Sequence, residues 1–300
     1  MTTTRSLVLT GIEHARRCLH GSVLWRALMP LGRKPDNVTR AHPSPSPRTA
    51  SPSLSPSELG LRDSAIGGWF NQEAGELCPG YSVGTSDIVV DVGCGGGGNA
   101  RFCASMGAST TVVDVSTEAL ARAQELMRGE PGAGTAIQSD GNPLPLPDEC
   151  ATRVVCTEVL EHVDDPHSFL AELVRIGKHG ALYLLSVPDP IGEEIQRHVG
   201  PEGYFKKPHH VRVIQRQEFA DMISAAGLLI EKRAYNGFFW AMWWSLCWPL
   251  KVDMRNPDHP VMNGWLSTWS ELLKTPEGPT IKRLLDGVMP KSQIVIARKP

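Results

Sequence analysis

The sequence predicts an α/β fold built on a doubly wound, parallel sheet, and three observations carry this prediction. Short β-branched runs alternate with helical patterns, a glycine-rich turn follows the first clear run, and acidic side chains follow several runs. Strands that alternate with helices form parallel sheets, whose ligands bind at the carboxyl ends of the strands. The 300 residues are long enough to bury a sizeable core.

The composition excludes several classes of protein. The net charge of -2 excludes a nucleic-acid binder that relies on bulk positive charge. The seven cysteines form no C-x-x-C pair, so neither a disulfide framework nor a zinc cluster is indicated, and a reducing cytoplasm is the expected location. No uninterrupted apolar run reaches about 18 residues, the length that a membrane-spanning helix needs. The nearest run, 237–250, is too short.

The first 57 residues differ in composition from the rest of the chain. Residues 41–57 are mostly Pro and Ser, which cannot bury enough surface to fold. Before them, Arg5 to Lys34 is basic, with apolar residues at roughly helical spacing, which suits an organelle transit peptide, a surface-seeking helix or a weakly ordered extension. We therefore expect a disordered extension over 1–57 and one domain over 58–300.

The first strand, turn and helix point to a nucleoside-containing cofactor. The β-branched run Asp87 to Val92 ends at the glycine string 93–98, before a helical pattern over 99–106. Glycines let the backbone turn tightly and approach a ligand, which then meets the free N–H groups of the helix start. A second run, 110–113, ends in Asp114 before a helix over 117–127. A carboxylate at that strand tip is placed to accept the hydroxyls of a ribose.

The glycine string alone does not decide which cofactor binds. Gly93, Gly95 and Gly98 satisfy G-x-G-x-x-G, the fingerprint of dinucleotide binding, and so a nicotinamide-dependent oxidoreductase remains an alternative. Asp91 favours a different ligand, because the strand before a dinucleotide turn is normally apolar. A ligand with a cationic amino group beside its sugar would pair with that carboxylate, directly or through water.

These residues carry a family resemblance. VVDVGCGGGG, then VVDVS, then SDGNPLPLPDEC with TEVLEHV and the stretch to SVPDP resemble a class I S-adenosylmethionine-dependent methyltransferase of the type 11 group, over about Val89 to Lys232. The resemblance implies a Rossmann-like fold with a seven-stranded, mostly parallel sheet, an antiparallel last strand near 293–298, and S-adenosylmethionine as cofactor. It implies these cofactor-binding residues: Asp91, Gly93, Gly95 and Gly97 around the methionine part, Asp114 with Val115 at the ribose, Asp140 and Gly141 at the adenine, and Glu158 along the cleft.

The later elements fit the same pattern. We expect strands over 152–157, 181–187 and 228–233, a helix that begins at Pro166, and another over 217–226. His179 and Gly180 are expected to end the helix before the strand at 181. Asp114, Asp140 and Glu158 then share one edge of the sheet with the glycine turn.

Three side chains are candidates for the acceptor side of a methyl transfer. The cofactor carries its own leaving group, so the protein positions the acceptor, excludes water and supplies a base where the acceptor is a hydroxyl or an ammonium. His162 lies just beyond the fourth strand, and His210 matches a cleft-facing His of the family, with Tyr204 in the preceding polar loop. The alternatives are a capping role for His162 and a solvated surface loop for the other two. No H-E-x-x-H pattern occurs, so no metal is expected.

Aromatic side chains supply the candidates for substrate contact. Trp69 and Phe70 lie on an expected helix over 58–77, where they either cover the cofactor or pin the helix to the sheet. Of the eight Trp, six fall between Trp240 and Trp269, in an expected insertion at about 237–290 that includes a helix over 262–274. Trp240 and Trp244 are candidates for an acceptor wall, and the alternatives for the insertion are a homodimer seam, a peripheral membrane contact or ordinary core.

Together these features predict an S-adenosylmethionine-dependent methyltransferase that acts on a small-molecule or lipid-like metabolite by direct in-line transfer. An NAD(P)-dependent oxidoreductase and a non-catalytic assembly protein with the same fold are the alternatives. Nucleic acid is not expected as a partner, because the part of the chain after residue 59 is acidic.

Overall fold

A seven-stranded sheet forms the centre of the molecule in the computed structural model, which describes residues 54–253 and 256–300. The strand order is β5-β4-β3-β6-β7-β9-β8; β9 is antiparallel to both neighbours, and the other adjacent pairs are parallel. The predicted fold class is thereby confirmed. The strands are β3 (Ile88–Val92), β4 (Ser109–Asp114), β5 (Ala133–Gln138), β6 (Ala151–Thr157), β7 (Gly177–Pro188), β8 (Leu229–Asn236) and β9 (Ser292–Arg298).

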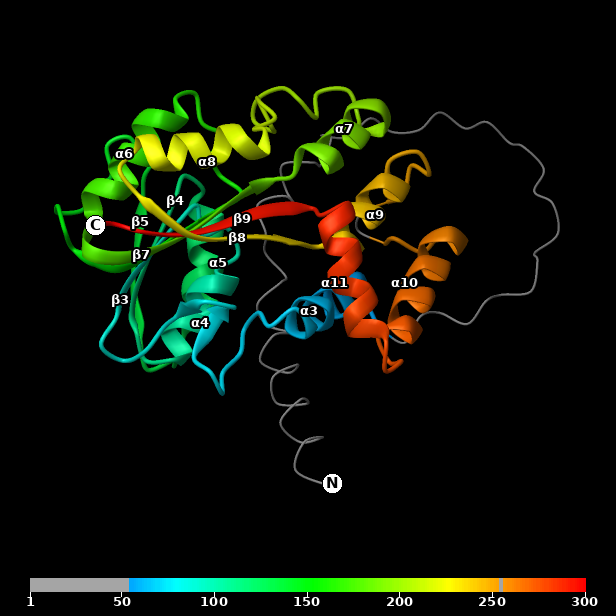
Figure 1. Cartoon of the computed structure of the whole chain (residues 1–300), viewed down its shortest axis with the longest axis horizontal. Helices are drawn as coiled ribbons and strands as arrows, with labels where there is room; N and C mark the ends of the chain where they lie inside the picture. Colours follow the sequence, from blue (N-terminus) through cyan, green and yellow to red (C-terminus); the bar gives the residue numbers. More distant parts are fainter. Residues whose placement is uncertain (1–53, 254–255) are drawn as a thin grey trace.

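Helices cover both faces of this sheet (Figure 1). On one face, α4 and α5 pack with the short hairpin β1–β2, and on the other face α6 and α8 pack. These elements are α4 (Gly98–Ser105), α5 (Thr117–Met127), β1 (Glu76–Cys78), β2 (Tyr81–Ser82), α6 (Pro166–Ile176) and α8 (Arg216–Ala225). Because both faces are buried, the central strands contain near-continuous apolar runs.

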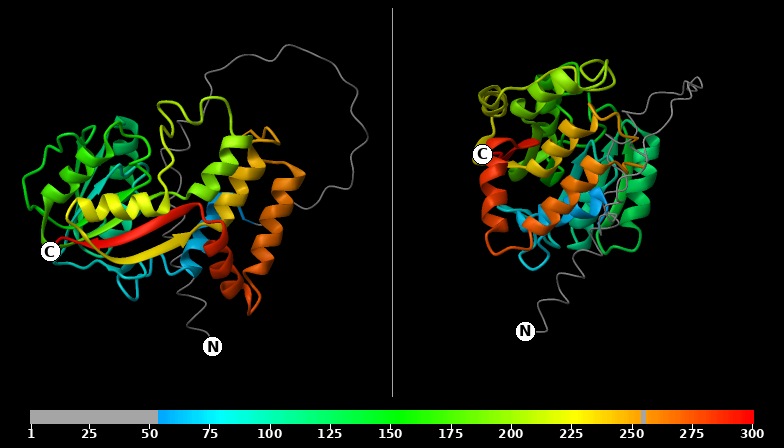
Figure 2. Two further views of the ribbon diagram at one scale, coloured as in Figure 1. Left: turned by 45° about the horizontal axis from the view of Figure 1, so that its top comes forward. Right: turned by 90° about the vertical axis from the view of Figure 1, so that its right-hand side faces the viewer.

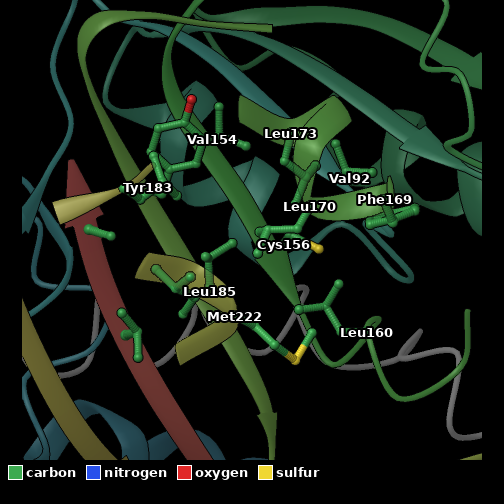
Figure 3. Close-up of a cluster of buried hydrophobic side chains, with 14 of the residues drawn as sticks. Val92, Val154, Cys156, Leu160, Phe169, Leu170, Leu173, Tyr183, Leu185 and Met222 are labelled. Carbon is green, nitrogen blue, oxygen red and sulfur yellow. The ribbon is translucent and has the colours of Figure 1, made fainter. Parts of the chain in front are cut away.

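Strand β7 shows how the side chains alternate between the two cores. Tyr183 and Leu185 point to the side of α6, where they meet Leu170 and Leu173 (Figure 3). Leu182 and its alternate neighbours belong to the opposite cluster, against α4 and the β1–β2 hairpin. The register of β7 is therefore fixed, because a shift by one residue would exchange the two sets of side chains.

The Trp-rich segment forms a helical unit beyond the end of the sheet. It contains α9 (Phe238–Cys247), α10 (Pro260–Leu272) and α11 (Gly278–Val288), which lie between β8 and β9 as the predicted insertion requires. Together with α3 (Pro56–Ile66) these helices enclose their own hydrophobic cluster around Trp243 and Trp269 (Figures 1 and 2). Among residues 54–253 and 256–300, no helix has the length and apolar character that crossing a membrane requires.

A buried ion cluster ties this helical unit together. Lys282 on α11 is fully buried and pairs with Asp286 at 2.5 Å and with Asp63 of α3 at 3.3 Å. Asp63 also accepts the indole N–H of Trp269, at 2.9 Å. The other oxygen of Asp286 accepts the backbone N–H groups of Gly237 and Phe238, which begin α9. One lysine thus joins charges on α3 and α11 to the start of α9.

The structure departs from the expected elements at two places. The helix expected over 58–77 is the shorter α3. It begins at Pro56, where Ser55 and Glu58 form a capping box, and it ends at Ile66, with Gly67 as its C-cap. The domain boundary expected at residue 58 therefore falls inside the helix. Residues 1–53 of the expected extension lie outside the described residues. His179 and Gly180 do not end a helix: α6 ends at Ile176, and β7 has already begun.

The glycine turn gives a prediction about stability. Gly97 caps α4 with φ +81°, and a Cβ there would lie 2.6 Å from the Cα of Ala123, a backbone atom that cannot rotate away. We expect Gly97→Ala to lower the free energy of unfolding by about 2–4 kcal/mol, through backbone strain plus steric overlap.

Gly129 provides the matched control for this substitution. It has φ +85° but nothing within 4 Å of the added Cβ, so Gly129→Ala retains the strain without the overlap, and should cost about 1 kcal/mol. Urea unfolding of both variants measures the difference. Equal losses would show that overlap with Ala123 contributes nothing.

Candidate active site

A cavity of about 850 Å³ opens at the carboxyl edge of the sheet, above β3, β4 and β6. It is lined by the glycine turn, by the ends of β4 and β5, by the segment after β6 and by the loop before α8. Glycine-turn residues, acidic strand ends and histidines thus face the same space. Its size suits a cofactor together with a small acceptor.

Asp114 holds the glycine turn in place from the end of β4. One carboxylate oxygen accepts the backbone N–H of Gly95 at 2.9 Å, and the other accepts that of Ser116, also at 2.9 Å. The side chain is largely buried yet lines the cavity. A carboxylate has about four acceptor positions, so Asp114 retains capacity for ligand hydroxyls.

Asp91 lies behind the same turn, and its carboxyl group has no partner there. It is 1% exposed, and neither carboxylate oxygen has a hydrogen-bond partner among the described residues. Burial, and then the negative charge of Asp114, raise the pKa of Asp91 to about 7. An orphaned buried carboxyl next to a glycine turn is the feature that a cationic group of a ligand would satisfy.

Glu158 lines the cavity directly after β6, and its side chain is held by two partners. Its backbone has φ +59°, the Ser186 hydroxyl donates to its carboxylate at 2.9 Å, and Lys291 forms an ion pair with it. Burial alone would raise the pKa of Glu158, but Lys291 and these hydrogen bonds hold it below its usual value. The strained backbone and the two partners indicate a site residue whose orientation is fixed.

The acceptor side contains a buried hydrogen-bonded trio. Glu193 accepts the hydroxyl of Tyr204 at 3.0 Å, and its second oxygen lies 2.7 Å from Nδ1 of His210. All three side chains are buried, and both ring-bearing residues line the cavity. Burial, and then the charge of Glu193, raise the pKa of the Tyr204 phenol above its usual value. Tyr204 is therefore a hydrogen-bond donor here and not a base.

His162 lies beside this trio, and its chain neighbour Glu161 lies there too. The rings of His162 and His210 are 5.0 Å apart, and burial lowers the pKa of His162. Glu161 is 1% exposed and has no hydrogen-bond partner for either carboxylate oxygen among the described residues. Burial, and then Glu158, raise its pKa well above the usual value.

A second group of side chains could hold a divalent cation. One ligand atom each from Glu161, His162 and His210 lies within 4.8 Å of the others. The absence of H-E-x-x-H spacing was the basis for expecting no metal. That local pattern could not show that His210, 48 residues further along the chain, lies beside Glu161 and His162. The expectation that no metal is needed stays a prediction. Melting curves with and without added Mn²⁺ test occupancy.

Known proteins resemble this chain in both sequence and fold. Residues 90–185 match the model of a family described as "Methyltransferase domain", of type 11. This range includes the glycine turn, Asp114, Asp140 and Glu158.

Residues 90–185 are thus the part of the chain that resembles the type 11 methyltransferases.

Curated proteins that are similar to this chain are named ubiquinone biosynthesis O-methyltransferases. The protein of Aeromonas salmonicida is 33% identical over 156 residues, which are 47% of this chain and 63% of that protein. The mitochondrial protein of Schizosaccharomyces pombe is 33% identical over 105 residues, 33% of this chain and 37% of that one. The chain thus spans less than two thirds of the length of these relatives.

Solved structures support the fold alone. Geranyl diphosphate C-methyltransferase from Streptomyces coelicolor has a TM-score of 0.52 at 15% identity, covering 84% of this chain and 85% of its own. A candidate methyltransferase from Bacillus halodurans has a TM-score of 0.51 at 21% identity, covering 77% and 97%.

Most of the expected site residues lie at this cavity. The cavity-lining members are Gly93, Gly95, Asp114, Val115, Asp140, Gly141, Glu158, His162, Tyr204, His210 and Phe70. Asp91 and Gly97 lie one layer behind them, Asp91 as the orphaned carboxyl and Gly97 as the cap of α4.

Three of the four aromatic candidates for substrate contact do not line the large cavity. Trp69 packs against the hydrophobic cluster beside the β1–β2 hairpin, and Trp240 packs over Gly60 of α3. Trp244 borders a separate void of about 20 Å³, behind Tyr204 and His210. The insertion packs beyond the end of the sheet, so its Trp side chains line a helical core and not the large cavity.

Two residues that shape the site were not predicted from the sequence. Glu193 follows the fifth predicted strand in an ordinary amphipathic helix, and Lys291 directly precedes the last strand. Each acts on partners far away in the chain, so no local pattern indicated them. The one available signal for Glu193 is its place in an amphipathic helical pattern that directly follows a strand end.

Proposed function

We propose that this chain transfers a methyl group from S-adenosylmethionine to a hydroxyl oxygen of an aromatic or lipid-like small molecule. The observation that carries the proposal is one cavity lined by the Asp114-held glycine turn and by a histidine pair, with the orphaned Asp91 one layer behind the turn. The relatives named O-methyltransferases of ubiquinone biosynthesis support oxygen as the acceptor atom. That name also supports an acceptor with a ring and an apolar part.

Each half of the cavity would have its own task. Asp91 would pair with the amino group of the cofactor, and Asp114 with the ribose hydroxyls, beside the glycine turn. The bound cofactor supplies an activated methyl group on a sulfonium. His210 and His162 would hold the acceptor hydroxyl and take its proton as the new oxygen–carbon bond forms. The walls formed by Val163 and Phe169 would exclude water.

The test measures cofactor binding first and transfer second. Calorimetry with S-adenosylhomocysteine is expected to show one site, and titration with NADH none. Methyl transfer from labelled cofactor is then assayed on catechol and 4-hexylcatechol, with hexylamine as the control acceptor. Labelled methyl ethers from the catechols are the expected product. Binding of NADH without S-adenosylhomocysteine would instead support the oxidoreductase alternative.

Asp91 gives a pH prediction for cofactor binding. Its pKa is raised to about 7, so in the free protein the carboxyl is largely protonated below that pH. Pairing with an ammonium requires the carboxylate. We therefore expect the affinity for S-adenosylhomocysteine to fall as pH drops below about 7, by up to about tenfold per pH unit.

Asp91→Asn is the variant that tests this cause. It should bind more weakly at pH 8 and lose the pH dependence between 5.5 and 8, because the amide does not titrate there. Calorimetry at four pH values suffices. A variant that keeps the slope of the native protein would assign the proton to another group.

The partners and the location of the protein are parts of the same proposal. A homodimer or peripheral membrane contact would form through the helical unit of α9 to α11, which contains six of the eight Trp. The cytoplasmic location expected from the cysteines stays a prediction.

A further inference from the structure

Glu193 lies on α7 (Pro190–Val199), directly behind the acceptor side of the cavity. Glu193 is 4% exposed and does not line the large cavity, yet it borders the small void of about 20 Å³ beside it. The helix that bears it is anchored at its start, where Asp189 caps the first turn and pairs with Arg216 at 2.6 Å. The position of the Glu193 carboxyl is therefore well defined.

The two hydrogen bonds of Glu193 determine how its neighbours face the cavity. The Tyr204 hydroxyl donates to Oε1 at 3.0 Å, and His210 Nδ1 lies 2.7 Å from Oε2. An ionised carboxylate can only accept, so the bond assigns a hydrogen to Nδ1 of His210. In the neutral ring, Nε2 is then left with its lone pair.

We infer that Glu193 is the positioning residue of the acceptor side. It fixes the His210 ring in the tautomer whose Nε2 accepts a hydrogen bond, and it orients the Tyr204 ring beside it. This inference rests on the proposed function, in which the acceptor hydroxyl donates to His210. Glu193 touches neither the cavity nor the reacting atoms and works through the two rings.

The Trp-rich insertion supports this arrangement from behind. Helix α7 packs against α9 of the insertion. Trp244 borders the same small void as Glu193 and His210, and the Trp248 ring lies 6.3 Å from that of Tyr204, edge on. The insertion thus contributes to the acceptor side through α7 and Tyr204, although its Trp side chains do not line the large cavity.

The chain offers a matched control one residue further along α7. Glu194 is exposed and pairs with Arg197 at 3.2 Å on the outer face of the helix. Glu194→Gln therefore removes the same charge from the same helix without touching His210 or Tyr204. Glu193→Gln keeps the size of the side chain, but its amide has one acceptor oxygen for two donors.

The first experiment reads the ring directly and needs no acceptor. The full chain is labelled with ¹⁵N-histidine, and the His210 signals are assigned from the spectrum of His210→Gln. In the native protein and in Glu194→Gln, the hydrogen is expected on Nδ1. In Glu193→Gln we expect a mixture of tautomers. A single Nδ1–H tautomer in Glu193→Gln overturns the inference.

The second experiment measures turnover with 4-hexylcatechol as the probe. We expect Glu193→Gln to lower kcat at least tenfold, with the KM for S-adenosylmethionine and the affinity for S-adenosylhomocysteine within twofold of the native values. Glu194→Gln should match the native enzyme. If kcat and cofactor affinity fall by the same factor and the melting temperature falls as well, the role of Glu193 is merely structural and the inference is overturned.

The two experiments separate this inference from the proposed function. A native protein that methylates none of the catechols contradicts the proposed acceptor class, while the ¹⁵N spectra still report whether Glu193 sets the tautomer of His210.

Discussion

Asp114→Ala is expected to weaken binding of S-adenosylhomocysteine by about a hundredfold. The substitution removes the carboxylate proposed to hold the ribose, and charge-assisted hydrogen bonds contribute about 1.5–3 kcal/mol each. It also releases the backbone N–H groups of Gly95 and Ser116, which Asp114 holds at 2.9 Å in the free protein. The glycine turn then loses its fixed shape, so the loss combines direct contact with preorganisation.

Calorimetry on the full chain measures this loss, with Glu125→Ala as the control. Glu125 lies on the exposed face of α5 and pairs only with Arg128 at the surface, so its removal should leave affinity unchanged. Melting curves of both variants check that the domain is still folded. Affinity of Asp114→Ala within threefold of the native value would remove Asp114 from the proposed cofactor site.

The framework of the sheet was predictable because its signals are local. The run before Gly93, the run ending in Asp114 and the helix after Pro166 each combine periodicity with a specific start or stop residue. The structure places these elements within one or two residues of the expected bounds. The exception is the helix end expected at His179 and Gly180. Gly180 has φ +76°, a value that is also common at helix ends, but it lies inside β7.

The cofactor side of the candidate site was predictable for the same reason, and the acceptor side was not. Strand ends on one edge of a parallel sheet converge by topology, so Asp114 and Glu158 could be placed together in advance. The contact between Glu193 and His210 depends on how α7 packs on α9, which no single-sequence pattern encodes. The position of the Trp cluster beyond the sheet end depends on tertiary packing in the same way.

The ion cluster of the helical unit predicts the largest effect on stability. Lys282→Met should lower the free energy of unfolding by about 3–5 kcal/mol, although methionine fills nearly the same space. The loss arises because Asp63 and Asp286 stay buried without a cation, and burial already raises the pKa of Asp63 to about 6 against the opposing charge of Lys282. Without that charge, Asp63 can be accommodated only by taking up a proton.

Arg283→Met on the exposed face of the same helix is the control, and it should change stability by less than about 0.5 kcal/mol. Urea unfolding followed by Trp fluorescence suits the test, because the Trp269 indole donates to Asp63. The double variant Asp63→Asn/Lys282→Met should recover part of the loss, since the amide remains able to accept from Trp269 and carries no charge. If Lys282→Met alone were as stable as the native chain, the prediction would be contradicted. The three buried charges would then stabilise the fold no more than ion pairs in solvent do.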